Sequence, residues 1–532
     1  RRVEWTGGAL LARAAAFREG LRRRGLAAGE RVALWAPNLA DWVALDLAAF
    51  AEGVVLVPID PRAAAEERAR IVADADPALL VVSGEASGAA PPGGARPCVA
   101  LAALAREGSS WSAPRPARGD EPATIIYTSG SSGEPKGTVL RWQNLEFMLS
   151  HTEDRLAQLT GLPAGAERAL HFLPLCYAGS RILLWSALLR GARLTLLRDP
   201  RRLAACAPEA APDYFLCVPL ILDRLRAAAC SALSARVPRL APLLRRGLLA
   251  CERIERGEGR WRDRLALALC RRLVLDRLRA RLGGRLRGLI CGSAPLRPDT
   301  QRFFHAAGID VYQGYGLTET TALCTLDRPH AVRPGWVGHA LPGVELRLAD
   351  DGELLARGPN VFAGYWRRPA ATRAAFDGEG WFRTGDLAEV DAAGRWRILG
   401  RKGALLVLST GHNVAPEPVE EALRAALAAR DGAWAEAQPV VFGHGRPHLA
   451  ALVAPPPDAA IDPATLADAI EEVNAVRSPK EGIHAHRLLA EPFSCENGLL
   501  TPNLKLRRSA IAARYASLLA SLYEEAAAAR AP

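Results

Sequence analysis

RVALWAPN (residues 31–38), LADWVALDLAAFAEG (39–53) and VVLVPID (54–60) form the stretch that decides the fold. The outer two segments are short apolar runs of strand length, and the segment between them has the pattern of an amphipathic helix. AAAEERARIVADAD (63–76) then predicts another helix and ALLVVSGE (78–85) another strand. A β-α-β-α-β order of this kind predicts parallel strands covered by helices on both faces, which is a doubly wound α/β sheet.

The rest of the chain predicts a second domain, because 532 residues exceed what one ordinary hydrophobic core holds. A Gly/Pro/Ala-rich segment (84–97) predicts a surface loop, and an arginine-rich region (220–287) predicts helices. After residue 330, Asp-Gly and Ala-Gly pairs between short strands indicate hairpins and a small β-barrel-like portion. We expect an N-terminal domain of mixed and parallel sheets over 1–399 and a small α+β domain over 400–532.

Composition and charge narrow the classes of partner. The formal net charge of +11 suits nucleic acid, an anionic membrane or a polyanionic substrate such as ATP or coenzyme A. No zinc-finger spacing, RNP-like aromatic string or long basic tail is present, so we expect no nucleic-acid partner. Apolar runs stay below the roughly 18 uncharged residues of a membrane span, so membrane contact is expected to be peripheral at most. The sequence does not indicate an oligomeric state.

Cysteine and lysine usage add two further expectations. Ten cysteines without a CxxC pair or zinc-ligand spacing predict neither a disulfide framework nor a structural metal, and a reducing cytoplasm fits them best. Only four of the 68 basic residues are lysine, namely Lys136, Lys402, Lys480 and Lys505. A chain this rich in arginine is expected to keep lysine where a compact, flexible ammonium is needed.

The strongest local signal is ATIIYTSGSSGEPKGT (123–138), an apolar strand that runs into a loop of glycines, hydroxyls and Lys136. Glycines let backbone N–H groups converge on phosphate oxygens, and the lysine adds a mobile cation, so the segment predicts a phosphate cradle. It differs from the P-loop of NTPases, in which lysine directly follows the last glycine. A polar surface turn is the alternative, but the length, the order and the preceding strand favour the cradle.

Five further segments occur in a fixed order after this loop: CGSAPL (291–296), VYQGYGLTETT (311–321), GWFRTGDL (380–387), LGRKG with STGHNVAPEPVEE (399–421) and ENGLLTPNLKLRR (496–508). Together they resemble the superfamily of adenylate-forming enzymes, which holds acyl-coenzyme A synthetases, luciferases and peptide-synthetase adenylation domains. The last two segments are most similar to long-chain acyl-coenzyme A synthetases. FLCVPLILDRL (215–225) and FLPL followed by Arg181 point the same way.

The resemblance assigns nucleotide-binding roles to named residues. The loop that would hold the β- and γ-phosphates of ATP consists of Thr128, Ser129, Gly130, Ser131, Ser132, Gly133 and Lys136. The segments that would surround the adenine ring consist of Gly292, Ser293, Ala294, Gln313, Gly314, Tyr315 and Gly316.

It also implies roles in catalysis. Thr318 would donate to the α-phosphate and Glu319 would bind Mg²⁺, for which one carboxylate suffices when phosphates supply other ligands. Asp386 and Arg401 would hold the ribose. Lys505 would swing in on a mobile C-terminal domain and stabilise the charge that develops as the carboxylate attacks the α-phosphorus.

Two half-reactions are implied: formation of acyl-AMP and pyrophosphate, then attack of a thiol on the acyl carbon with release of AMP. The small domain of the family rotates between them about a hinge next to Arg401. Here the chain departs from the pattern, because Gly403, preceded by Lys402, stands where the family usually has Asp or Lys. Tyr177, after Cys176, stands where many relatives carry a histidine that gates the acyl and coenzyme A site.

The expected activity is therefore ATP-dependent activation of a medium- or long-chain fatty acid and its transfer to coenzyme A. Two alternatives stay open. The acyl group would instead be loaded onto the phosphopantetheine of an acyl carrier protein, or the chain would be a non-catalytic nucleotide-binding scaffold. Because no acyl-enzyme is needed in this chemistry, the cysteines are expected to be packing residues.

Overall fold

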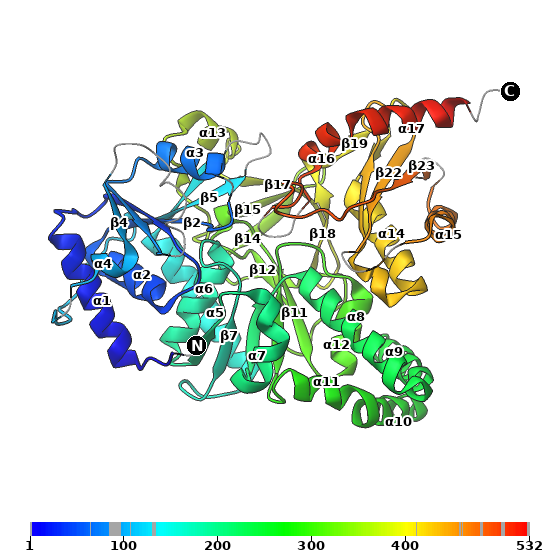
Figure 1. The fold of residues 1–532 in the computed structure, drawn as a ribbon, viewed down its shortest axis with the longest axis horizontal. Helices are drawn as coiled ribbons and strands as arrows, with labels where there is room; N and C mark the ends of the chain where they lie inside the picture. The colour runs from blue at the N-terminus through cyan, green and yellow to red at the C-terminus, as the bar shows by residue number, and fades with distance from the viewer. Residues whose placement is uncertain are drawn as a thin grey trace.

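The structure is a computed structural model that describes residues 3–63, 65–84, 97–106, 108–129, 135–410, 412–456, 459, 461–478, 482–501 and 506–528. Two seven-stranded sheets and a smaller antiparallel sheet make up the larger part of the molecule. The segment that follows residue 404 forms a separate body at one end, shown yellow to red in Figure 1. Most of the expected loop at 84–97 lies outside the described residues.

The first sheet confirms the β-α-β-α-β prediction. β2, β1, β3 and β4 pair in parallel, β5 joins β2 in parallel, and the antiparallel strands β6 and β16 extend that edge. From edge to edge its strands are β16 (Gly364–Tyr365), β6 (Pro135–Arg141), β5 (Pro122–Ser129), β2 (Val55–Ile59), β1 (Arg31–Trp35), β3 (Leu79–Val82) and β4 (Cys98–Ala100). The strands β1, β2 and β3 are almost fully buried, as expected of a sheet covered on both faces.

The second sheet repeats this construction. β8, β7, β9, β10 and β11 are parallel, and two short antiparallel strands close the edge beyond β11. Its strands are β13 (His339–Ala340), β12 (Thr325–Leu326), β11 (Asp310–Tyr315), β10 (Gly288–Cys291), β9 (Tyr214–Cys217), β7 (Arg168–His171) and β8 (Arg193–Leu196).

Helices cover both sheets, and two of them share a core with both. Ile126 of β5, Met148 of α5, Ile182 of α6 and Ile290 of β10 belong to one buried cluster, so α5 and α6 pack between the sheets. The helices of this part are α1 (Gly7–Arg22), α2 (Ala40–Glu52), α3 (Ala65–Ala75), α4 (Leu101–Leu104), α5 (Trp142–Thr160), α6 (Ala178–Leu189), α7 (Leu203–Ala210), α12 (Pro298–Ala306) and α13 (Pro369–Ala374).

The arginine-rich region is helical, as predicted. It forms α8 (Pro219–Arg236), α9 (Ala241–Glu255), α10 (Trp261–Cys270), a π-helical turn (Arg271–Leu275) and α11 (Asp276–Arg281). In Figure 1 the segment from α9 to α11 lies at the edge of the molecule. No helix among the described residues has the length and apolar character that a membrane span needs.

The third sheet is the predicted barrel-like portion, and it leads to the C-terminal body. It is antiparallel, in the order β14 (Glu345–Leu348), β15 (Glu353–Arg357), β17 (Phe382–Val390) and β18 (Trp396–Arg401). The C-terminal body holds β19 (Leu406–Val407), β20 (Asn413–Val414), β21 (Gln438–Phe442), β22 (Leu449–Ala454), β23 (Ile483–Leu488), α14 (Pro416–Arg430), α15 (Pro463–Ala475), α16 (Arg508–Arg514) and α17 (Ala516–Ala528).

This α+β body has its own apolar core, which agrees with the predicted fold class. The inner faces of α14 and α15 pack on one side of the sheet formed by β21, β22 and β23. A second cluster on the other side includes α16 and α17. Ion pairs join the body to the larger part, Arg224 with Glu436 at 2.9 Å and Arg297 with Glu421 at 3.5 Å. The boundary at residues 399–400 stays a prediction.

A buried ion pair fixes α6 against α2. Arg181 is paired with Asp46 through both carboxylate oxygens, and it also donates to Thr124 Oγ1 at 2.6 Å. Trp185 Nε1 donates to the same carboxylate at 2.9 Å. Because Arg181 and Asp46 are both buried, each charge depends on the other for compensation.

We expect Asp46→Ala to lower the free energy of unfolding by about 3–5 kcal/mol, because it leaves the Arg181 charge buried without its carboxylate. Asp41→Ala is the matched control. Asp41 pairs with Arg13 at 2.8 Å where both side chains are partly exposed, and its loss should cost about 1 kcal/mol or less. Urea denaturation measures both values. Equal effects of the two substitutions would contradict a stabilising role for the buried pair.

Candidate active site

The two strands that flank the predicted phosphate-binding loop are β5 and β6. The two strands pair antiparallel, with Thr128 opposite Lys136 and Ser129 opposite Pro135. Gly130, Ser131, Ser132 and Gly133 lie outside the described residues. Thr128 and Lys136 therefore lie opposite each other at the described ends of these strands, and their contact with phosphate stays a prediction.

Tyr365 contacts both Lys136 and Glu319, two predicted site residues that are 183 positions apart in the chain. The strand β16 pairs with β6, placing Tyr365 opposite Thr138. The Tyr365 hydroxyl donates to Glu319 Oε1 at 2.9 Å, and Lys136 Nζ lies 5.4 Å from the centroid of the Tyr365 ring. Burial, and then the charge of Glu319, raise the pKa of Tyr365, so its hydroxyl stays a donor. Sequence reasoning missed Tyr365.

The segment after β11 holds Thr318 and Glu319 in a tight turn. Thr318–Thr320 form one 3₁₀ turn, and the backbone oxygen of Glu319 accepts from the Phe362 N–H at 2.8 Å. Thr321 and Ala322 have φ of 51° and 91°, values that side-chain-bearing residues rarely adopt. A Cβ on Gly316 would stand 2.2 Å from the Ala322 oxygen, so only glycine fits there. The turn is thus held by surrounding structure in an unusual conformation.

The ends of β10 and β11 approach each other closely. A Cβ on Gly292 would lie 3.1 Å from the Gly314 oxygen, and Ser293 has a φ of 74°. Ser293 and Ala294 are exposed at this strand end. Gln313 differs from its neighbours, because its buried side chain donates to Gln301 Oε1 at 2.9 Å and to the Trp336 oxygen at 3.0 Å.

Three predicted nucleotide-binding residues form a connected set. The Tyr315 hydroxyl donates to Asp386 Oδ2 at 2.5 Å, and Arg401 Nε pairs with Asp386 Oδ1 at 2.8 Å. Asp386 is buried, whereas half of the Arg401 side chain is exposed. Burial, and then the Asp386 charge, raise the pKa of Tyr315. A carboxylate has acceptor positions left after two such contacts, so Asp386 can receive further hydroxyl donors.

The predicted hinge residue Lys402 is held by two carboxylates of the third sheet. Its Nζ lies 2.5 Å from Asp351 Oδ2 and 2.8 Å from Glu353 Oε2, and these hydrogen bonds raise its pKa. Nothing lies within 4 Å of a Cβ built on Gly403, so a side chain would also fit at this position. The two carboxylates were not singled out from the sequence.

The predicted gate residue Tyr177 lies at the start of α6. Its hydroxyl donates to Asp60 Oδ2 at 2.7 Å, and Asp60 is paired in turn with Arg62 at 3.0 Å. Burial raises the pKa of Tyr177 well above its ordinary value. Asp60 directly follows β2, so the contact joins the first sheet to α6. Sequence reasoning did not predict this partner.

A cavity of about 650 Å³ lies between α2, α5, α6 and the strands β5 and β6. Its wall is mainly apolar and includes Phe50, Leu145, Leu149, Ile182 and Trp185. Ala178, which follows the gate residue, and Ile126, two positions before Thr128, also line it. The segment 215–225 does not line this cavity; Phe215, Cys217 and Leu222 pack in the core of the second sheet.

Two predictions concern groups that the structure does not place. Lys505 lies outside the described residues, although Leu500 and Leu506 on either side of it form an isolated β-bridge. For Mg²⁺, the described residues contain no cluster of three or more His, Cys, Asp or Glu side chains that would hold a metal by themselves. The single carboxylate of Glu319 fits an ion whose other ligands come from phosphates and water.

Known proteins identify the family. Residues 1–366 match the AMP-binding enzyme family, and residues 404–527 match the AMP-binding enzyme C-terminal domain. A Mycobacterium bovis protein named long-chain-fatty-acid–CoA ligase FadD15 is 33% identical, covering 96% of this chain and 91% of its own. An Arabidopsis thaliana protein named long-chain-fatty-acid–[acyl-carrier-protein] ligase AEE15, chloroplastic, is 27% identical, covering 95% and 81%.

Among solved structures, the A domain of carboxylic acid reductase from Segniliparus rugosus, in complex with AMP and a carboxylic acid, is similar in fold. It superimposes with a TM-score of 0.75 at 22% identity, over 97% of this chain and 87% of that one. This protein belongs to the AMP-binding enzyme family. Within it, the chain is an acyl-CoA synthetase of the AMP-forming acid–thiol ligase class, and it uses ATP.

We expect Tyr365→Phe to raise the Mg²⁺ concentration needed for half-maximal ATP–pyrophosphate exchange by about 10-fold, because the hydroxyl that orients Glu319 is lost. Tyr127→Phe is the matched control, since it removes a tyrosine hydroxyl of the same sheet that donates to Asp74 at 2.7 Å rather than to Glu319. A Mg²⁺ titration of exchange measures both. An unchanged Mg²⁺ requirement in the Tyr365 variant would show that the contact does not act through a metal.

Proposed function

We propose that the protein activates a medium- or long-chain carboxylic acid as its acyl-adenylate and then transfers the acyl group to coenzyme A. The observation that carries the proposal is the meeting of Lys136, Glu319 and Tyr365 at one edge of the first sheet, beside the mouth of the glycine loop. A cation and a metal-binding carboxylate at this place suit a triphosphate whose β- and γ-phosphates leave together.

In the first half-reaction the substrate carboxylate attacks the α-phosphorus and pyrophosphate leaves. Lys136 and the loop N–H groups neutralise the leaving phosphates. Glu319, oriented by the Tyr365 hydroxyl, would hold Mg²⁺, which when bound offsets phosphate charge. Thr318, in the constrained turn beside it, donates to the α-phosphate.

Ribose binding follows from the Tyr315–Asp386–Arg401 set. Asp386 is pre-oriented by two donors, so it can accept from the ribose hydroxyls without losing conformational freedom at that moment. Tyr315 is held at the end of β11, where its ring would lie against adenine. Gly292, Ser293 and Ala294 follow β10, the strand next to β11.

Lys505 supplies the remaining charge in the first step, and a rotation about Lys402 and Gly403 removes it for the second. The contacts of Lys402 with Asp351 and Glu353 hold one arrangement of the C-terminal body, while Gly403 allows the backbone to turn. In the second half-reaction the coenzyme A thiol attacks the acyl carbon, and the bond to AMP breaks.

The cavity beside α6 supports a long apolar substrate. Its volume falls within the range of ligand pockets, and its wall is mainly apolar. Ala178, which follows Tyr177, and Ile126, two positions before Thr128, line it, so an acyl chain placed there could have its carboxylate at the side of the cavity that these residues form. The cavity, rather than the family likeness alone, is why we propose a medium or long chain.

Lys505→Ala should lower carboxylate-dependent ATP–pyrophosphate exchange by roughly 100-fold or more, because a transition-state contact is lost. Thioester formation from supplied acyl-AMP should fall much less. Lys480→Ala, a lysine outside the motifs, is the control and should leave both steps unchanged. Unchanged exchange in the Lys505 variant would remove the assigned role, and absence of exchange in the unaltered protein would favour the scaffold alternative.

Leu149→Trp should make long-chain acids poorer substrates, because a larger side chain on α5 would fill part of the cavity. We expect kcat/KM for long-chain acids to fall about 10-fold or more while short-chain acids are little affected. Leu348→Trp, at an exposed position of β14, is the control. Pyrophosphate release across a series of acids measures the profile, and an unaltered profile would place the acyl chain elsewhere.

The carrier-protein alternative has one specific support, the similarity over 95% of the chain to a relative named as an acyl-carrier-protein ligase. The same acid series distinguishes the acceptors when AMP release is followed with coenzyme A and, separately, with a phosphopantetheinylated carrier protein. Faster release with coenzyme A is the outcome that the proposal requires.

A further inference from the structure

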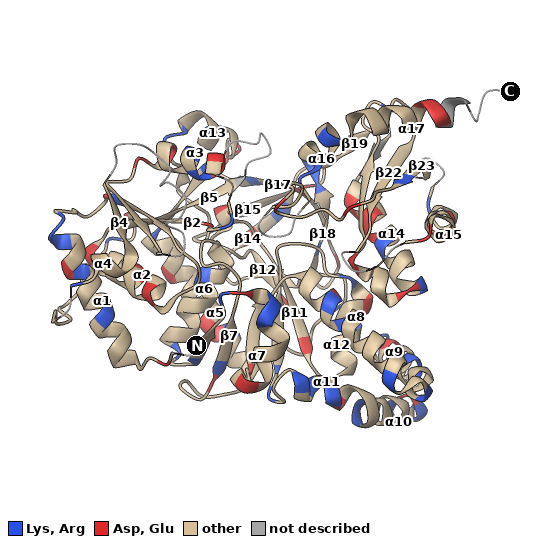
Figure 2. Ribbon diagram, in the orientation of Figure 1, with Lys and Arg blue, Asp and Glu red and all other residues tan. Residues whose placement is uncertain are grey.

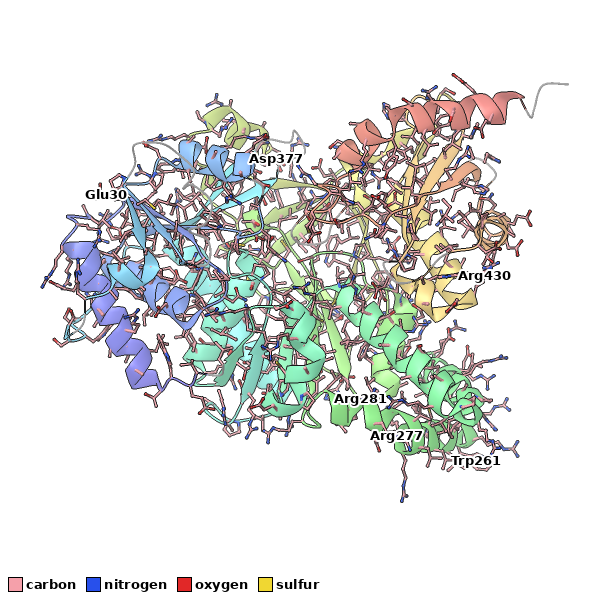
Figure 3. The ribbon with its side chains drawn as sticks, viewed as in Figure 1. Glu30, Trp261, Arg277, Arg281, Asp377 and Arg430 are labelled. Carbon is pink, nitrogen blue, oxygen red and sulfur yellow. The ribbon has the colours of Figure 1, made fainter. Side chains whose placement is uncertain are left out.

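The helices α9, α10 and α11 form a projection that no predicted site residue occupies. The helix α9 packs against α10 on one side and lies next to α12 on the other. In α10 the residues that face this packing are buried; they are Asp263, Ala266, Leu267 and Cys270. Figure 3 shows Trp261 at the outer end of the projection, with Arg277 and Arg281 along its lower edge.

An exposed apolar row runs along the opposite side of α10 and onto the π-helical turn that follows it. Trp261, Leu265, Leu269 and Leu273 follow one another at intervals of four residues, and 69%, 52%, 44% and 46% of their surfaces are exposed. Residues at this spacing lie on one side of a helix. Leu249 of α9 is also exposed. Thirteen large apolar residues are exposed in the described part of the chain, and these five are among them. The projection therefore gathers exposed apolar side chains that usually occur singly on protein surfaces.

Positive charge surrounds this row. Residues 241–281 contain twelve arginines against five carboxylates, a surplus of seven in a chain whose net charge is +11. Figure 2 shows basic residues along the same helices. Arg262 lies over the Trp261 ring at 5.4 Å, and Arg264 and Arg272 are exposed beside the leucines. Neither Arg264 nor Arg272 has a carboxylate partner among the residues that the structure describes.

A cavity of about 550 Å³ opens on the flank of the row. Arg264, Arg271 and Arg272 line it together with one carboxylate, Asp276, and the apolar residues Ile254, Leu267 and Ala268, so its lining carries a net positive charge. Arg271 begins the π-helical turn, and such turns occur often at functional sites. Guanidinium groups beside apolar side chains suit a phosphate group that is attached to acyl chains.

We propose that this side of α10, which we call the α10 face (Trp261, Leu265, Leu269 and Leu273 with Arg262, Arg264 and Arg272), docks on an anionic lipid bilayer. The tryptophan and leucines would enter the interfacial region while the arginines contact lipid phosphates. A bilayer fits better than an acidic protein because the apolar residues form one row on an outward-facing helix. Long arginine side chains at its borders can reach up to the headgroups while their stems stay among the apolar groups.

Vesicle co-sedimentation of the full chain tests the proposal. The protein should bind vesicles of phosphatidylcholine with about 30% phosphatidylglycerol, bind pure phosphatidylcholine far less, and lose binding as salt is raised. The variant L265E/L269E should lose binding, with Val476→Glu as its control at another exposed apolar position. The variant R262Q/R264Q/R272Q should bind roughly 100-fold more weakly, with R23Q/R70Q/R373Q as its control for total charge.

All four variants should keep ATP–pyrophosphate exchange with a short soluble acid, which shows that they are folded. If the leucine variant does not fold, the vesicle binding of the arginine variant decides the test. The arginine variant is expected to fold, because its three positions are exposed and its arginines form no ion pair among the described residues. Binding that is absent in the unaltered protein, equal on neutral vesicles, or equal in the α10 variants and their controls would overturn the proposal. The proposal would also be overturned if the α10 variants still bind vesicles but no longer retain a protein that co-purifies with the unaltered chain.

Discussion

The contact between the Tyr365 hydroxyl and Glu319 is the interaction on which the rest of the site depends. It exists because β16 adds to the edge of β6 and places Tyr365 within reach of Glu319. Lys136 lies on β6 of the first sheet and Glu319 in the turn after β11 of the second, so Tyr365 contacts a predicted site residue from each. The Tyr365 ring also gives Lys136 an aromatic face to rest on.

The two seven-stranded sheets explain why the proposed nucleotide and acyl regions lie next to each other. Both sheets share the core around α5 and α6, so the phosphate strands β5 and β6, the end of β11 and the start of α6 are fixed relative to one another. The buried pair of Arg181 with Asp46 locks α6 at the wall of the apolar cavity.

Much of this arrangement could be predicted from the sequence, because the informative signals are local. Alternating strand and helix patterns predicted the doubly wound sheets. The segments predicted to bind phosphate and adenine lie at the ends of β5, β10 and β11, while their contact with a nucleotide stays a prediction. What could not be predicted are partners made by tertiary contact. Tyr365 reaches Glu319 through an edge strand of two residues, and Asp60 reaches Tyr177 across 117 positions. Gln313 belongs to a predicted binding segment, yet its buried amide bonds to Gln301 and the Trp336 carbonyl.

The site as a whole can be examined most directly by a crystal structure with a non-hydrolysable ATP analogue and Mg²⁺. We predict that the β- and γ-phosphates lie between residues 128–136 and the carboxylate of Glu319, with the ribose hydroxyls on Asp386. A triphosphate bound away from Lys136 and Glu319, or a ribose that leaves Asp386 untouched, would contradict the account.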